Sequence, residues 1–201
     1  MPRSHKILYI LYILIWIAAA IQPKYPADWL LENILPVVLF PLVIWLDTRF
    51  HFTLPALILL LIFSSLHALG AHYTYAEVPG FEPLSKLFGF TRNNFDRVVH
   101  FLFGLLLFRP VFEIFVHFIH NVKVLLLVTF SVIASVSALY EILEWTAAVL
   151  FHPDLGIAFL GTQGDIWDAQ KDMLAADIGA AINLSLFYPF YNRYTKEIYR
   201  G

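Results

Sequence analysis

Three pairs of polar side chains in this sequence have the spacing that places both members on one face of a helix. The pairs are Asp96 with His100, Glu141 with Glu144, and Asp168 with Asp172. Residues three or four positions apart are neighbours on a helix surface. Because imidazole nitrogens and carboxylate oxygens suit zinc, manganese, iron and magnesium, the pairs together predict a site for a divalent cation.

The site that we expect around these pairs includes further polar residues. The candidate metal ligands are His67, Asp96, His100, Glu141 and Glu144. The candidates to complete the site, or to act as the general base for a metal-bound water, are Asp165, Asp168 and Asp172. The polar residues expected beside them are His72, Asn94, Arg97, Trp167 and Gln170.

The elements that must position these residues are membrane helices, because little of the chain is polar. Of the 201 residues, 60% are hydrophobic and 14% are charged, whereas roughly 25% are charged in soluble domains. Six apolar segments approach the roughly 20 residues that a helix needs to cross a bilayer. They are 7–21, 29–46, 52–71, 98–118, 122–151 and 173–191. We therefore expect an all-α polytopic bundle of about six transmembrane helices, forming a single membrane domain over 1–201.

A path of six helices also fixes which helix ends share a side of the membrane. On this path, the polar residues at and beside the ends of the last four segments all fall on one side. Burying a carboxylate near lipid costs about 2.5 to 3.5 kcal/mol even on lenient scales. Several carboxylates together need compensation, and a divalent cation is one source of it.

Charge and cysteine content narrow the classes of partner and site. The 13 Lys and Arg and 15 Asp and Glu give a net charge of −2, so there is no basic field for nucleic acid. The absence of cysteine excludes thiolate metal sites and a cysteine nucleophile. More Lys and Arg flank the side that holds both termini, which favours a cytoplasmic location for both ends.

Structural roles without a metal could also explain the same residues. Asp96 could cap a helix, Asp165 could cap a short turn, and Asp168 could interact with a helix dipole. His67 could be a satisfied core histidine. Ion pairs could form instead of a metal site: Arg97 or Lys171 with Glu141 or Glu144, and Arg109 with Glu113 at helical spacing.

Three runs of residues resemble the YjdF-like family of bacterial inner-membrane proteins. The runs are Asn94-Phe-Asp-Arg-Val-Val-His-Phe101, Tyr140-Glu-Ile-Leu-Glu-Trp145, and Gly161-Thr-Gln-Gly-Asp-Ile-Trp-Asp-Ala-Gln-Lys-Asp-Met173. His67 with Tyr73 or Tyr75 fits the same pattern. The resemblance implies a multi-pass protein of the bacterial inner (cytoplasmic) membrane, and it supplies no reaction.

A fainter similarity joins the chain to VanZ-like membrane proteins, which are associated with glycopeptide resistance and envelope lipids. The Asp-x-x-x-His-Phe start of one helix and the Gly179-Ala180 step of a later acidic helix carry it, whereas Glu141-x-x-Glu144 departs from the Glu-x-x-Gln form of those proteins.

Three functions are compatible with the pattern. The first is a divalent-metal-dependent hydrolase or transferase that acts on a lipid or envelope substrate from the extracytoplasmic face. The second is a transporter or proton-coupled carrier that uses the same acids and histidines as a relay. The third is a structural or partner-binding bundle with an ion-paired network.

Overall fold

The computed structural model describes residues 1–150 and 163–198, and all of its regular elements there are helices. Phe151, Gly161 and Thr162, which belong to the predicted span and motif, lie outside this part of the chain. The six candidate spans are α1 (Arg3–Ala20), α2 with α3 (Pro26–Phe50), α4 (Leu54–Tyr73), α6 (Phe95–Phe115), α7 (Val122–Leu150) and α9 (Asp168–Ile198). The prediction of a polytopic helical bundle with about six spans is confirmed.

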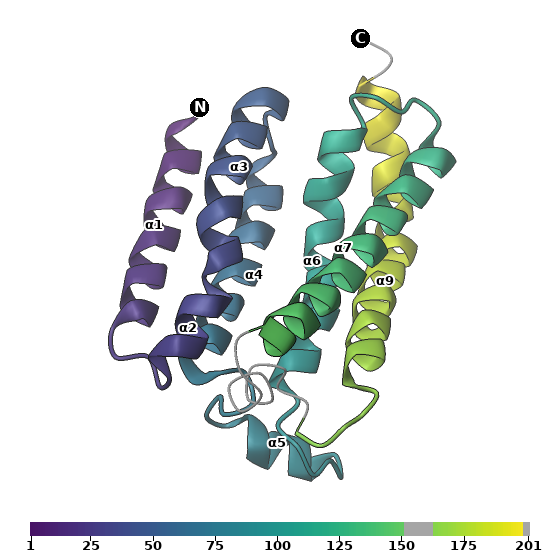
Figure 1. Ribbon diagram of the computed structural model, residues 1–201. Coiled ribbons are helices and arrows are strands. Elements are labelled where there is room, and N and C mark those ends of the chain that lie inside the picture. The colour runs from purple at the N-terminus through teal and green to yellow at the C-terminus, as the bar shows by residue number, and fades with distance from the viewer. Residues whose placement is uncertain (151–162, 199–201) are drawn as a thin grey trace.

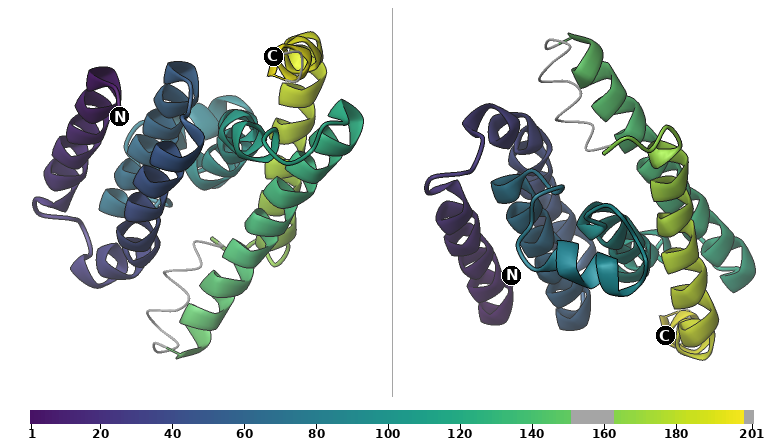
Figure 2. Two further views of the ribbon diagram at one scale, coloured as in Figure 1. Left: turned by 90° about the horizontal axis from the view of Figure 1, so that it is seen from above. Right: turned by 90° about the horizontal axis from the view of Figure 1, so that it is seen from below.

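The six spans run back and forth, so both termini lie at one end of the bundle (Figure 1). We call this the terminal end. Helix α6 contacts α4 on one side and α9 on the other, α1 packs on α4, and α7 packs on both α6 and α9. Figure 2 shows α7 and α9 crossing each other. The first residues of α6 and α9 and the last turns of α7 therefore meet at the end away from the termini, which we call the loop end.

The second span is two helices and not the single continuous one that the apolar segment predicted. Helix α2 (Pro26–Glu32) ends before Asn33, and α3 (Ile34–Phe50) follows it. The Asn33 side chain holds the break, because its amide donates to the Trp29 carbonyl at 2.6 Å and its oxygen accepts from Trp16 Nε1 at 2.5 Å. The break lies next to Glu32 and turns this buried acid toward α7.

Two glycines allow α6 and α9 to approach closely. A Cβ atom at Gly104 would overlap the backbone carbonyl of Ala176, and one at Gly179 would overlap the carbonyl of Phe101. Asn183 adds a hydrogen bond across the same contact, from its amide to the Leu105 carbonyl at 2.6 Å. This close contact brings the first turns of both helices together, and those turns carry the polar residues of the predicted site.

Buried polar contacts also fasten the helices at the terminal end. The predicted pair of Arg109 and Glu113 is confirmed at 2.9 Å, and Glu113 additionally accepts bonds from the backbone nitrogen and hydroxyl of Thr53. Asp47 of α3 contacts His5 at 2.9 Å and accepts a bond from the Tyr9 hydroxyl at 3.0 Å, both in α1. These residues satisfy one another, as buried charges in an apolar surrounding require.

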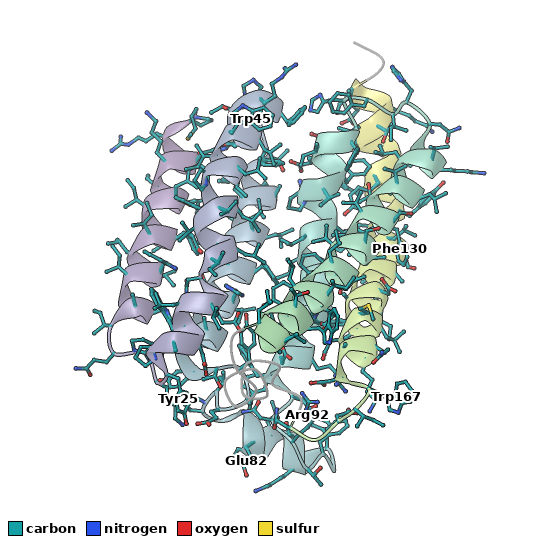
Figure 3. The ribbon with its side chains drawn as sticks, viewed as in Figure 1. Tyr25, Trp45, Glu82, Arg92, Phe130 and Trp167 are labelled. Atoms are coloured by element: carbon teal, nitrogen blue, oxygen red, sulfur yellow. The ribbon has the colours of Figure 1, made fainter. Side chains whose placement is uncertain are left out.

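A short helix and its flanking loops cover the loop end of the bundle. Helix α5 (Phe81–Leu87) lies there, and Tyr75, Val78 and Phe81 pack against Phe95 at the start of α6. Figure 3 shows Arg92 and Trp167 at the same end, far from Trp45 near the termini. The segment between α4 and α6 is therefore anchored over the polar residues by an apolar cluster.

Candidate metal site at the loop end

The centre of the candidate site is an imidazole between two carboxylates. The Nε2 atom of His100 lies 3.7 Å from Oδ1 of Asp96, one turn earlier in α6, and 3.3 Å from Oε1 of Glu141 in α7. His100 and Glu141 are buried, and the side chain of Asp96 is 13% exposed. Asp96 lies on the second residue of α6, and Asn93 supplies the side-chain bond to the Phe95 amide. Asp96 is therefore not the cap of this helix.

Asp172 of α9 completes a group with the spacing of metal ligands. One donor atom each from Asp96, His100 and Asp172 lies within 4.8 Å of the others. Ligand atoms about 2.0 to 2.6 Å from a common ion lie within about twice that distance of each other. Three predicted residues from α6 and α9 thus lie close enough together to bind one cation. Glu141 contacts the imidazole of His100 from α7.

Asp172 and Asp168 of α9, and Asp165 in the turn before it, form ion pairs with basic side chains. Arg97 donates to Asp172 through Nε at 3.0 Å and also pairs with Asp168, which is shared with Arg92. Lys171 pairs with Asp165 at 2.7 Å. Within the described chain, no ion pair joins Arg97 or Lys171 to Glu141 or Glu144, so this part of the alternative interpretation is wrong.

Asp165 has a structural role in the turn before α9. Its Oδ1 accepts a hydrogen bond from the Trp167 amide at 3.1 Å, as expected for a capped turn. The ammonium group of Lys171 donates to its other oxygen and holds the pKa of Asp165 below its usual value. Asp168 begins α9, where a negative charge suits the helix dipole. Neither acid is left unpaired beside His100.

Both ring nitrogens of His67 have partners other than a metal. Nε2 lies 3.2 Å from the backbone oxygen of Glu32, which can only accept, so this nitrogen carries the proton. Burial raises the pKa of Tyr75 well above its usual value, so its hydroxyl keeps its proton and donates to Nδ1 of His67. Of the two tyrosines named with His67 in the sequence analysis, Tyr75 makes this contact. His67 is a satisfied histidine beside the site.

The remaining predicted residues surround the site at different distances. Glu144 is half-buried on α7 and interacts electrostatically with Asp96, Glu141 and Glu32. His72 bonds the Ala19 carbonyl at 2.9 Å and belongs to the contact with α1. The other three lie at the outer edge: Asn94 bonds Ser85 of α5, while Trp167 and Gln170 are exposed.

Two residues of this region escaped the sequence analysis. Glu32 is buried and accepts a bond from the Tyr140 hydroxyl at 3.2 Å, which links α2 to α7. The signal for Glu32 was an acid inside an apolar segment, four positions after Asp28. Arg92 also reaches Asp168, although it precedes the helix and had no helical spacing to it.

A largely apolar cavity of about 310 Å³ borders the site, between α1, α3, α4, α6 and α7. Asp96, His100 and Tyr140 line its polar end. Ser137, one turn before Glu141, also lines it, is 2% exposed, and has a hydroxyl without a hydrogen-bond partner in the described chain. A buried hydroxyl without a partner calls for an explanation such as a ligand.

The sequence matches one family model and is similar to a known inner membrane protein. The family model described as "Predicted membrane protein (DUF2238)" matches residues 4–193. The chain is 36% identical over 187 residues to the inner membrane protein YjdF of Escherichia coli (strain K12), covering 90% of this chain and 87% of that protein. No solved structure matches the chain.

Proposed function

Because this chain belongs to the DUF2238 family of predicted membrane proteins, we propose that it is a multi-pass inner-membrane protein that binds a divalent cation for chemistry on a lipid or envelope substrate. Asp96, His100 and Asp172 are the proposed ligands. The observation that carries the proposal is the convergence of their donor atoms within 4.8 Å. Both termini would be cytoplasmic, which puts the site at the extracytoplasmic face.

The roles of the acids follow from their partners. A divalent cation at this position would acidify a bound water and polarise a phosphoryl or carbonyl oxygen. Glu141 is the proposed general base, because it contacts His100 at 3.3 Å and its Oε1 accepts no hydrogen bond within the described chain. Asp165 and Asp168 would hold Arg92, Arg97 and Lys171 in place at the edge of the site.

A hydrolase or transferase has more support than a carrier. A proton-coupled carrier needs titratable groups along a path between both membrane faces. The buried groups at the terminal end, Glu113 with Arg109 and Asp47 with His5, are paired with each other. Between them and the candidate site, the cavity wall is mostly apolar, with residues such as Leu57, Leu60 and Phe103. The polar groups that α1 contributes to this wall are the hydroxyls of Tyr9 and Tyr12.

Metal analysis of the purified protein tests the proposal. We expect about one equivalent of zinc, manganese, iron or magnesium per chain, and a higher melting temperature when the bound ion is restored after chelation. Asp96→Asn, His100→Ala and Asp172→Asn should each abolish both effects. Asp177→Asn is the matched control, because Asp177 lies on the same helix outside the ligand group.

Two results would overturn it. One is a protein without stoichiometric metal whose stability is unchanged by manganese, zinc and magnesium. The other is equal metal binding by the wild type and by all three ligand variants. Folded Glu144→Ala with unchanged metal content would place Glu144 outside the ligand set, whereas loss of folding would assign it a structural role.

A further inference from the structure

We infer that the cavity beside the candidate metal site binds the single hydrocarbon chain of a lipid phosphate, which reaches the site laterally from the bilayer between α3 and α7. The inference has two parts. The location of the hydrocarbon chain of the ligand depends on the cavity alone. The location of the phosphate rests on the proposed function, because it needs the cation.

The composition of the cavity wall fits a hydrocarbon chain. Leucine, phenylalanine and valine side chains of five helices make up most of the wall. Its charged or titrating groups Asp96 and His100 lie at one end, while Tyr9 and Tyr12 of α1 add hydroxyl groups elsewhere on the wall. Polar groups that fix the orientation of a ligand at one end of an apolar pocket are typical of small-molecule sites. An amphiphile has the same division into an apolar body and a polar end.

Residues at the rim show where the cavity opens. Leu39 of α3 lines the cavity and is 46% exposed, and Leu139 and Leu143 of α7 line it and are 56% and 51% exposed. These leucines lie within membrane spans, so their exposed surface faces lipid. A ligand can therefore pass from the bilayer into the cavity between α3 and α7 without crossing water.

The size of the cavity selects the number of chains. Its volume of about 310 Å³ is at the lower limit of the roughly 300 to 1,000 Å³ usual for small-molecule sites. Along α4 the lining residues extend from Leu57 to His67, which is roughly 15 Å at 1.5 Å per residue. A cavity of this volume, about half as long as the bilayer is thick, suits one hydrocarbon chain better than the two chains of a phospholipid.

The polar end suits a phosphate only when a cation is present. Asp96 and Glu141 would repel a phosphate, whereas a divalent ion held by carboxylates commonly also binds the phosphate oxygens of a substrate. The buried Ser137 hydroxyl lines this end and has no partner among the residues that the structure describes. It is an independent indication of a ligand there, because it could donate to a phosphate oxygen.

Binding of dodecyl phosphate and dodecanol, measured by native mass spectrometry with and without manganese, tests both parts. We expect the wild type to retain dodecanol in either condition, and to bind dodecyl phosphate about tenfold more tightly with manganese. Inorganic phosphate at the same concentration should not displace dodecyl phosphate, because it lacks the chain. Ser137→Ala should weaken binding of the phosphate and leave binding of dodecanol unchanged.

A pair of tryptophan variants on α7 separates the cavity from the general lipid-facing surface. Leu139→Trp places a larger side chain at the rim and should weaken the binding of dodecanol and of dodecyl phosphate about tenfold. Leu127→Trp is the control, since Leu127 is 64% exposed on the same helix and does not line the cavity. Equal retention of dodecanol by the two variants would overturn the inference, even if manganese binds.

The outcomes also distinguish this inference from the proposed function. Suppose that manganese does not bind while dodecanol binding still depends on Leu139. The metal proposal and the phosphate assignment are then wrong, and the cavity remains a site for a hydrocarbon chain. If manganese binds but the phosphate gains no affinity from it, the cation site stands and the phosphate assignment is overturned.

Discussion

The Nε2 atom of His100 in α6 lies 3.3 Å from the Oε1 atom of Glu141 in α7, and this contact joins two membrane spans in their buried interior. The same nitrogen faces Asp96 at 3.7 Å. One imidazole thus lies between carboxylates of two helices, with Asp172 of a third helix within ligand distance. In the proposed function, a divalent cation supplies the positive charge that these groups share.

The close packing of α6 against α9 should require glycine at position 104. Gly104→Ala should lower the free energy of unfolding by at least about 1 to 3 kcal/mol, because the added Cβ would overlap the Ala176 backbone. Thermal or denaturant unfolding in detergent measures the change. Ala181→Val, on an exposed part of α9, should stay within about 0.5 kcal/mol. Equal stability of Gly104→Ala and wild type would show that the helices are not in such close contact.

The buried pair at the terminal end should be essential to stability. Glu113→Ala removes the acceptor of Arg109 and Thr53, and breaking a buried pair costs about 3 to 5 kcal/mol. The double variant Arg109→Met with Glu113→Leu should lose less than Glu113→Ala alone, because no charge is left without a partner.

The exposed pair Arg193–Glu197 has the same spacing and provides the control for this comparison. Glu197→Ala should cost far less stability than Glu113→Ala, because water screens an exposed pair. Similar losses for Glu113→Ala and Glu197→Ala would contradict the buried ion pair.

The turn before α9 should be sensitive to acid. Lys171 holds the pKa of Asp165 below its usual value, so ionised Asp165 stabilises the folded state above its unfolded pKa of about 3.9. This contribution is lost as the pH falls through the lower folded pKa.

Hydrogen exchange over residues 163–171, corrected for intrinsic rates, should therefore be slow at neutral pH and should increase below about pH 4. Lys171→Met should move the loss of protection to higher pH, and Asp165→Asn should remove its pH dependence. An identical acid profile for wild type and Asp165→Asn would exclude this carboxylate as the cause.

The orientation of the bundle can be read from single cysteines, because the natural chain has none. Leu87→Cys lies at the loop end and replaces a residue that is 78% exposed. Arg193→Cys lies near the C-terminus, where the side chain is 82% exposed. With cytoplasmic termini, an impermeant maleimide added to intact spheroplasts should label Leu87→Cys at once and Arg193→Cys only after lysis. The reverse pattern would place the candidate site in the cytoplasm.

Hydropathy predicted the spans well, because each span must satisfy its backbone inside lipid as a helix. The same reasoning missed the break at Asn33, which depends on the hydrogen bonds of the Asn33 side chain to the Trp29 carbonyl and to Trp16 Nε1, and not on the apolar run itself. It also placed the start of α9 at residue 173, whereas this helix begins at Asp168 and continues to Ile198. Polar turns at helix ends reduce hydropathy without ending the helix.

Helical spacing predicted part of the candidate site. It gives the face that Asp96 shares with His100, but not how close two helices come, which here depends on Gly104 and Gly179. It also cannot tell which acids already have partners. Asp168 pairs with two arginines, Arg92 and Arg97. Arg92 lies in the segment between α5 and α6, where helical spacing gives no prediction. His67 likewise lies in the predicted region, but its nitrogens bond Tyr75 and Glu32.

Anomalous diffraction from crystals of the protein grown with manganese tests the metal proposal most directly. The proposal predicts one peak within about 2.0 to 2.6 Å of oxygens of Asp96 and Asp172 and a nitrogen of His100. The peak should be absent from crystals of Asp96→Asn. A map from the wild-type crystals grown with manganese that has no peak between these three side chains, with Asp172 held only by Arg97, would contradict it.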